Sequence, residues 1–156
     1  MTTSQVGNVL TAAAAVLSAD ANLLAAVVPV YDGPTMSQAT NLEYVVVGHD
    51  PSGESTIAAQ TQQDWRSDGG ASAMRDEIIT FPITVVVRAG DTDIVTRRTR
   101  AYVLAGYVES ALRTNYTLGL AQVAWVEIAD QTLHQVAAAE GSIVYVESTV
   151  RARAVI

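Results

Sequence analysis

The stretch Glu-Ile-Ile-Thr-Phe-Pro-Ile-Thr-Val-Val-Val-Arg, residues 77–88, decides the fold class. Every second side chain in it is large and apolar, which is the period of a β-strand with one face against a core. Pro82 has no N–H to donate to a neighbouring strand, so we expect a bulge there or a position partly on a sheet edge. The predicted inward-facing set is Ile79, Phe81, Ile83, Val85 and Val87.

After this strand, the sequence predicts a turn and then a helix over residues 93–113. Asp91 or Thr92 can cap free N–H groups at its start, and the carboxylates of Asp91 and Asp93 suit the positive end of the helix dipole. We prefer this interpretation to a pair of catalytic carboxylates. The apolar stripe of the helix comprises Ile94, Ala101, Leu104, Ala105, Val108 and Leu112.

Before the central strand, apolar spacing predicts a helix over residues 3–17, with Thr2, Thr3 or Ser4 as its cap. Asp20 offers a second cap, which allows a short helix through residue 24. Two β-branched runs, residues 27–31 and 43–48, indicate strands. We expect residues 57–65 to return as the second strand of a hairpin with 43–48, and residues 67–73 to form a loop.

The C-terminal part predicts a strand over residues 123–128 and a long final strand over 142–156. Residues 132–140, rich in alanine, suggest a loop or a short helical turn. The resulting order of elements favours one α+β domain spanning residues 1–156. We expect an antiparallel or mixed sheet with the N-terminal and central helices packed on one face.

The composition argues against several kinds of function. The chain has no cysteine, so thiolate catalysis, thiolate metal sites and disulfides are excluded. The net charge of -7 argues against a cationic grip on nucleic acid. No apolar run approaches the length of a membrane-spanning helix, and the N-terminus has no basic flank, so neither a membrane anchor nor a secretory signal is expected.

The sequence offers no convincing catalytic or metal-binding residues. His49 and His134 stand in separate predicted loops without partners at metal-ligand spacing. A Ser-His-acid triad is not excluded, but no G-x-S-x-G elbow marks a nucleophile. Neither a G-x-G-x-x-G nor a G-x-x-x-x-G-K phosphate loop occurs. We therefore expect no cofactor, no metal and no enzymatic activity.

Two groups of residues are candidates for contacts between subunits. Arg97, Arg98 and Arg100 form the main basic cluster, which is either a solvated helix face or an ionic contact to an acidic neighbour. Asp64, Trp65 and Arg66 end a glutamine-rich segment. Trp65 is either a core anchor or an interface anchor, because tryptophan and arginine are both enriched at protein contacts.

In several segments the sequence resembles the tail terminator proteins of long-tailed, siphovirus-type bacteriophages, especially those that infect actinobacteria. The segments are Val28-Pro-Val-Tyr-Asp-Gly-Pro34, Glu43-Tyr-Val-Val-Val-Gly-His-Asp50, Gln62-Gln-Asp-Trp-Arg66, Arg75-Asp-Glu-Ile-Ile79 and Val87-Arg-Ala-Gly-Asp-Thr-Asp93. The resemblance extends over nearly the whole chain. The glutamine-rich stretch 60–63 departs from the family's pattern.

The resemblance implies a structural virion protein without catalytic residues. Its copies would form a hexameric ring that caps the tail tube, ends tube polymerisation and contacts the head connector. The implied partners are further copies of the chain, the major tail tube protein and the connector or stopper protein. The implied location is the tail or neck of the virion, with assembly in the host cytoplasm.

Other functions remain open at this stage. A head–tail connector stopper or another minor tail or neck protein would also be an oligomer. A small enzyme or ligand-binding module would instead have a deep pocket with convergent polar groups. In a ring, an acidic channel wall would let viral DNA pass without specific binding, since few cations would hold its phosphates.

Overall fold

The protein is described from a computed structural model, which covers residues 3–34, 41–51, 57–65 and 74–156. Arg66 and the predicted loop over residues 67–73 lie outside these ranges. The helices are α1 (Val6–Ser18), α2 (Ala21–Ala25) and α3 (Ile94–Thr114). The strands are β1 (Val30–Asp32), β2 (Glu43–Val47), β3 (Gln60–Trp65), β4 (Arg75–Ala89), β5 (Val123–Ala138) and β6 (Gly141–Val155).

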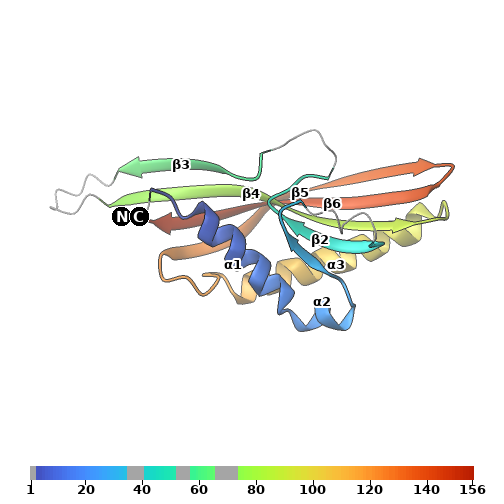
Figure 1. The fold of residues 1–156 in the computed structure, drawn as a ribbon, viewed down its shortest axis with the longest axis horizontal. Coiled ribbons are helices and arrows are strands. Elements are labelled where there is room, and N and C mark those ends of the chain that lie inside the picture. Colours follow the sequence, from blue (N-terminus) through green and yellow to red (C-terminus); the bar gives the residue numbers. More distant parts are fainter. Residues whose placement is uncertain (1–2, 35–40, 52–56, 66–73) are drawn as a thin grey trace.

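The strands form one mixed, six-stranded sheet in the order β1-β2-β4-β6-β5, with β3 also paired to β4. The pairing of β1 with β2 is parallel, and all other pairings are antiparallel. Helix α1 contacts β1 and β2, α3 contacts β4, β5 and β6, and the two helices touch each other (Figure 1). The predicted α+β class, with both long helices on one face, is confirmed.

The predicted hairpin between residues 43–48 and 57–65 is wrong. Strands β2 and β3 do not pair with each other; both pair with β4, one after the other along the same edge. The composition of each segment indicates a strand, but it carries no information on which strand is the partner.

Pro82 lies in the gap between these two strands. Strand β3 ends its pairing at Thr80 of β4, and β2 begins at Ile83. The Pro82 carbonyl accepts a hydrogen bond from the Gly48 N–H at 2.8 Å, so the backbone polar atoms of Pro82 face this gap. The predicted edge position is therefore right only locally, because β4 lies inside the sheet and Pro82 falls between the ends of two neighbouring strands. The alternative of a bulge is wrong, because β4 and β6 pair without a register shift.

The sheet's longest hairpin joins β5 to β6, which corrects the prediction for residues 132–140. Strand β5 continues to Ala138, and only Ala139 and Glu140 separate it from β6. The register between β5 and β6 shifts after Val123 and again after Ile128. The alanine-rich segment is part of β5 because it pairs with β6, as far as the pair of Ala138 with Gly141. This pairing overrides the weak intrinsic preference of alanine against a strand.

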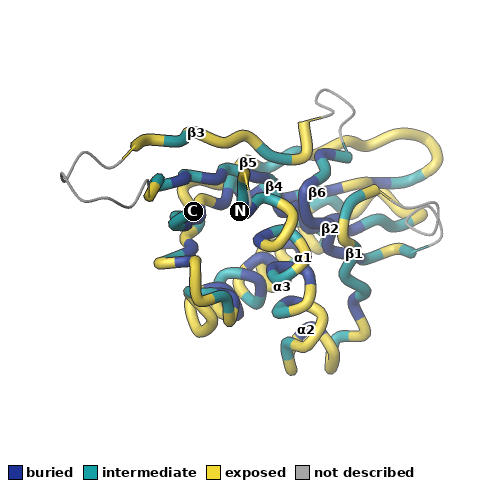
Figure 2. Tube along the Cα trace, turned by 60° about the vertical axis from the view of Figure 1, so that its left-hand side comes forward, coloured by how far each residue is buried: buried dark blue, intermediate teal, exposed yellow. Residues whose placement is uncertain are grey.

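The core lies between the sheet and the helices (Figure 2). All five predicted inward residues of β4 are buried, and Phe81 is the largest of the fully buried side chains. The predicted stripe of α3 is buried except for Ile94, which is only partly covered. Among the helices that the structure describes, none combines the length and apolarity that crossing a membrane requires.

Side-chain caps hold the starts of two helices. The cap of α2 is Asp20, as predicted, whereas the cap of α3 is Asp93 rather than Asp91 or Thr92. The Asp20 carboxylate accepts from the N–H groups of Asn22 and Leu23. The Asp93 carboxylate accepts from the Thr96 hydroxyl and the Thr96 N–H, which lowers the pKa of Asp93. At α1 the predicted cap is only partly right, because Gln5 occupies the cap position while the Ser4 hydroxyl accepts from the Val6 N–H at 3.1 Å.

Candidate assembly surfaces

A fully buried carboxylate, Glu77, ties the N-terminal segment to the sheet. It accepts a hydrogen bond from the Ser4 hydroxyl at 2.6 Å and from the Gln5 N–H at 2.7 Å. The Gln63 amide donates to it at 3.0 Å and also to the Thr3 carbonyl at 2.9 Å. Arg75 orients that amide by donating to its oxygen at 2.9 Å. Glu77 thus joins α1, β3 and β4 through one group.

The hydrogen bonds of Glu77 determine its ionisation. Burial disfavours the charged form, but hydrogen bonds from Gln5, Ser4, Gln63 and Thr61 outweigh it and lower the pKa of Glu77. Sequence reasoning missed this residue. The sequence did contain an indication of it. Glu77 alternates in step with the inward-facing Ile79 and Phe81, and a carboxylate that faces the core must find hydrogen-bond donors inside the fold.

The arginine cluster of α3 is largely engaged within the chain. Arg97 pairs with Asp91 at 2.7 Å, and Arg98 contacts the Gln135 amide oxygen at 3.4 Å. Arg100 forms a bidentate contact with Glu43 of β2, in which its guanidinium nitrogens lie 2.7–3.1 Å from the carboxylate oxygens. That carboxylate raises the pKa of Arg100. The cluster is therefore neither a uniformly solvated face nor a set of unpaired charges.

The Arg100–Glu43 pair is expected to make a modest contribution to stability. Both side chains are about one-third exposed, at 33% and 29%. Substituting Arg100→Ala should lower the free energy of unfolding by about 1 kcal/mol, because the bidentate contact is partly shielded from water. Urea unfolding in low salt and in about 1 M salt should show this loss shrinking in high salt. A loss unchanged by salt would indicate packing rather than charge.

Trp65 lies at the end of β3 and is 65% exposed, so the core-anchor interpretation is wrong for the isolated chain. The Arg75 guanidinium lies 4.9 Å from the Trp65 ring centroid. Asp64 is exposed beside it. An exposed tryptophan stacked by an arginine is typical of contact surfaces, so the interface interpretation of Asp64 and Trp65 stands as a proposal.

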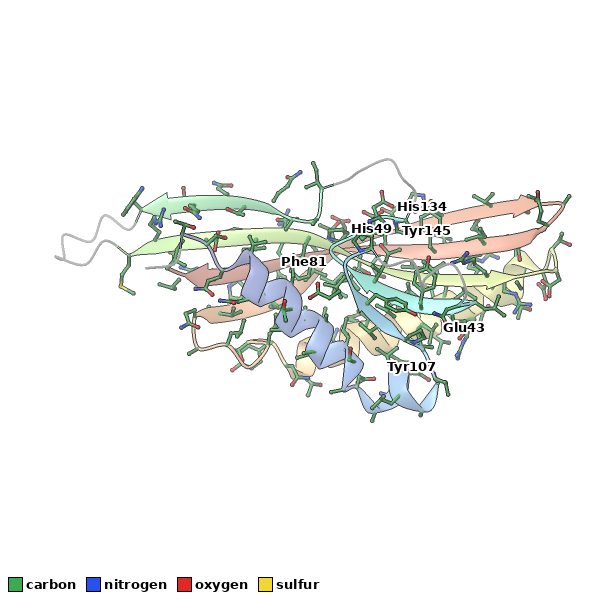
Figure 3. The ribbon with its side chains drawn as sticks, in the orientation of Figure 1. Glu43, His49, Phe81, Tyr107, His134 and Tyr145 are labelled. Atoms are coloured by element: carbon green, nitrogen blue, oxygen red, sulfur yellow. The ribbon has the colours of Figure 1, made fainter. Side chains whose placement is uncertain are left out.

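The two histidines are held by different parts of the sheet. His134 lies in β5 rather than in a loop and stacks on Tyr145 at 4.5 Å between ring centroids (Figure 3). The His49 carbonyl accepts from the Thr84 hydroxyl at 3.3 Å. Within residues 3–34, 41–51, 57–65 and 74–156, no cluster of three or more potential ligands is placed to bind a metal.

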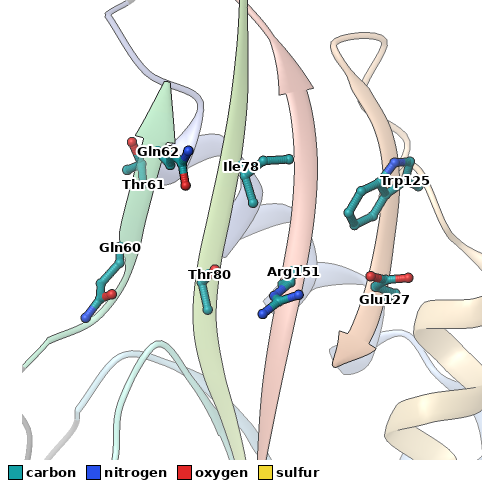
Figure 4. Close-up of a pocket in the computed structure, with 8 residues that line it drawn as sticks. All are labelled: Gln60, Thr61, Gln62, Ile78, Thr80, Trp125, Glu127 and Arg151. Atoms are coloured by element: carbon teal, nitrogen blue, oxygen red, sulfur yellow. The ribbon is translucent and has the colours of Figure 1, made fainter. Parts of the chain in front are cut away.

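An open groove crosses the face of the sheet that the helices leave uncovered (Figure 4). Its volume is about 590 Å³. Polar side chains from four strands line it together with Trp125 and Ile78. These polar residues are Gln60, Thr61, Gln62, Thr80, Glu127 and Arg151. Its floor is the regular surface of a sheet, and it offers no nucleophile beside a base.

A smaller depression lies where the β5–β6 hairpin turn meets the end of β4. Its volume is about 360 Å³, and its lining is mostly apolar. Leu42, Val136 and Ile143 contribute to it and are all exposed to solvent. Sequence reasoning missed this surface because residues 132–140 were not expected to be a strand.

Comparison with known proteins extends this description. No protein-family model matches the chain, and no curated protein sequence is detectably similar to it. A chain in the solved structure of the virion of a native gene transfer agent particle superposes on it with a TM-score of 0.66. The match covers 99% of this chain and 100% of that chain at 19% sequence identity. The protein therefore shares its whole fold with a chain of that virion.

Proposed function

We propose that the chain is a structural virion protein, specifically a tail terminator. Copies of it form a ring, a hexamer by the resemblance noted above, that caps the tail tube and ends its polymerisation. The ring then joins the tail to the head connector. The observation that carries this proposal is the end-to-end match in fold to a chain of a gene transfer agent virion. That likeness and the sequence resemblance point to the same kind of particle.

The surface of the chain also suits assembly. Strand β5 is at one end of the sheet, so among the described residues no strand pairs with the outer edge of this 16-residue strand. Such edges invite pairing with another molecule unless they are blocked. Trp65 and the apolar depression add two exposed contact surfaces. These features favour subunit contacts over chemistry at a pocket.

In this account, viral DNA passes through the ring without specific binding. The net charge of -7 gives few cations to hold phosphates, and Arg97 and Arg100 are already paired with carboxylates of the same chain. The protein would reside in the tail or neck of the virion after assembly in the host cytoplasm. Interface roles for Arg97, Arg98 and Arg100 remain part of the proposal.

The terminator role can be tested on growing tubes. Adding the purified protein to polymerising tail tube protein should shorten the tubes and place a ring at one end of each, as seen by negative-stain imaging. A connector stopper would instead bind DNA-filled heads and leave tube length unchanged. That second outcome would replace the terminator proposal with the stopper alternative.

A further inference from the structure

The two ends of the sheet carry two different surfaces with exposed apolar side chains. Trp65 projects from the end of β3, and the apolar depression lies at the turn between β5 and β6. Figure 1 places the end of β3 and the turn of the hairpin at opposite ends of the molecule's long axis. Each surface leaves apolar area in water, and neither can reach the other within one copy.

We infer that Trp65 of one copy docks into the depression of the next copy. The inference deepens the proposed ring, on which it rests, by naming both sides of the contact. Because the two surfaces differ, the contact is head-to-tail, and such contacts close into rings when the rotation between copies permits. The same contact without closure would give filaments.

The depression is suitable in size and lining for one indole ring. Its volume of about 360 Å³ falls in the range of pockets that accept small molecules. Leu42, Val136, Ala138 and Ile143 contribute apolar side chains to its lining. Buried tryptophans dominate many protein contacts because they cover a large area at low entropic cost.

Charge complementarity favours a second copy as the occupant. The Arg75 guanidinium lies on the Trp65 ring and would accompany it into the contact. Two charged residues line the depression, Arg88 and Glu140. Arg88 lies over the Tyr44 ring at 5.3 Å, whereas Glu140 is exposed at the hairpin turn, where it can meet the incoming Arg75.

The absence of cysteine permits a direct cross-linking test on the full chain. Met74 adjoins Arg75 and is 42% exposed, and Val136 in the depression is 53% exposed. Met74→Cys and Val136→Cys proteins, mixed and treated with a short bismaleimide, should give dimers that neither protein gives alone. A chain with both substitutions should give a ladder that ends at the ring size.

Further variants distinguish this contact from non-specific association between copies. In the doubly substituted chain, Trp65→Ala should reduce cross-linking at least about tenfold. Glu140→Arg should also reduce it, and combining Glu140→Arg with Arg75→Glu should restore it. Leu24→Asp changes a side chain of similar exposure, 61%, away from both surfaces and should have no effect.

The contact and the proposed function can fail separately. If the Met74→Cys and Val136→Cys mixture cross-links no better than a mixture of Met74→Cys with Leu24→Cys, the contact is wrong even where rings are seen. If the cross-links form as expected but the protein neither forms rings nor shortens tubes, the contact stands and the terminator role is wrong.

Discussion

Replacing Glu77 by alanine is expected to lower the free energy of unfolding by about 3 kcal/mol. The substitution removes the shared acceptor of the Ser4 hydroxyl, the Gln5 N–H and the Gln63 amide. The Gln5 N–H would lose this buried acceptor, and the start of α1 would lose its anchor on β4. Urea unfolding followed by circular dichroism measures the loss.

The pH dependence of Glu77→Gln is the matched control for charge. The pKa of Glu77 is lowered in the folded state, so its ionisation stabilises the fold above the pKa of the unfolded chain. That contribution disappears as the pH falls through the folded-state pKa. The stability difference between wild type and Glu77→Gln should therefore shrink from about pH 7 to about pH 3. A difference that is constant or grows on acidification would contradict the assignment.

Substituting Gly141→Ala is expected to cost about 3 kcal/mol of folding free energy. Gly141 opens β6 with a φ of 135°, a conformation that residues with a Cβ rarely adopt. A Cβ atom there would stand 2.1 Å from the Ala89 carbonyl oxygen, which belongs to the neighbouring strand backbone. The hairpin turn would have to move away from the end of β4. Thermal unfolding reports the loss.

Gly106→Ala makes the same change in side chain but is expected to stabilise the fold rather than destabilise it. Gly106 lies in the exposed part of α3, and a Cβ there would meet nothing within 4 Å. Alanine should stabilise the helix by about 0.5–1 kcal/mol. Equal effects of the two substitutions would mean that local strain at Gly141 is not the cause.

The sequence predicts an individual helix or strand well where its apolar residues recur with a single helical or strand period. The alternation in β4 and the stripe of α3 each follow from one buried face, and both are confirmed. The partner of β3 was not predictable, because Gln60 to Gln63 carry no apolar pattern that selects a neighbour. The length of β5 was missed because residues near Ala137 become strand only through pairing with β6.

The candidate contact surfaces were predictable only in part. The local composition around Trp65 indicates an anchor, but whether it packs inward depends on which faces the helices cover. Arg100 and Glu43 are 57 residues apart in the chain, and the fold alone brings them together. The apolar depression likewise joins residue 42 to the turn near residue 141, a proximity that no local pattern encodes.

Native mass measurement combined with negative-stain imaging of the purified protein tests the central claim most directly. The account predicts rings of a single size whose mass is a whole multiple of the 16.5 kDa chain. A protein that stays monomeric, both alone and with tail tubes, and turns over a small molecule in a way that one polar substitution abolishes, would contradict it.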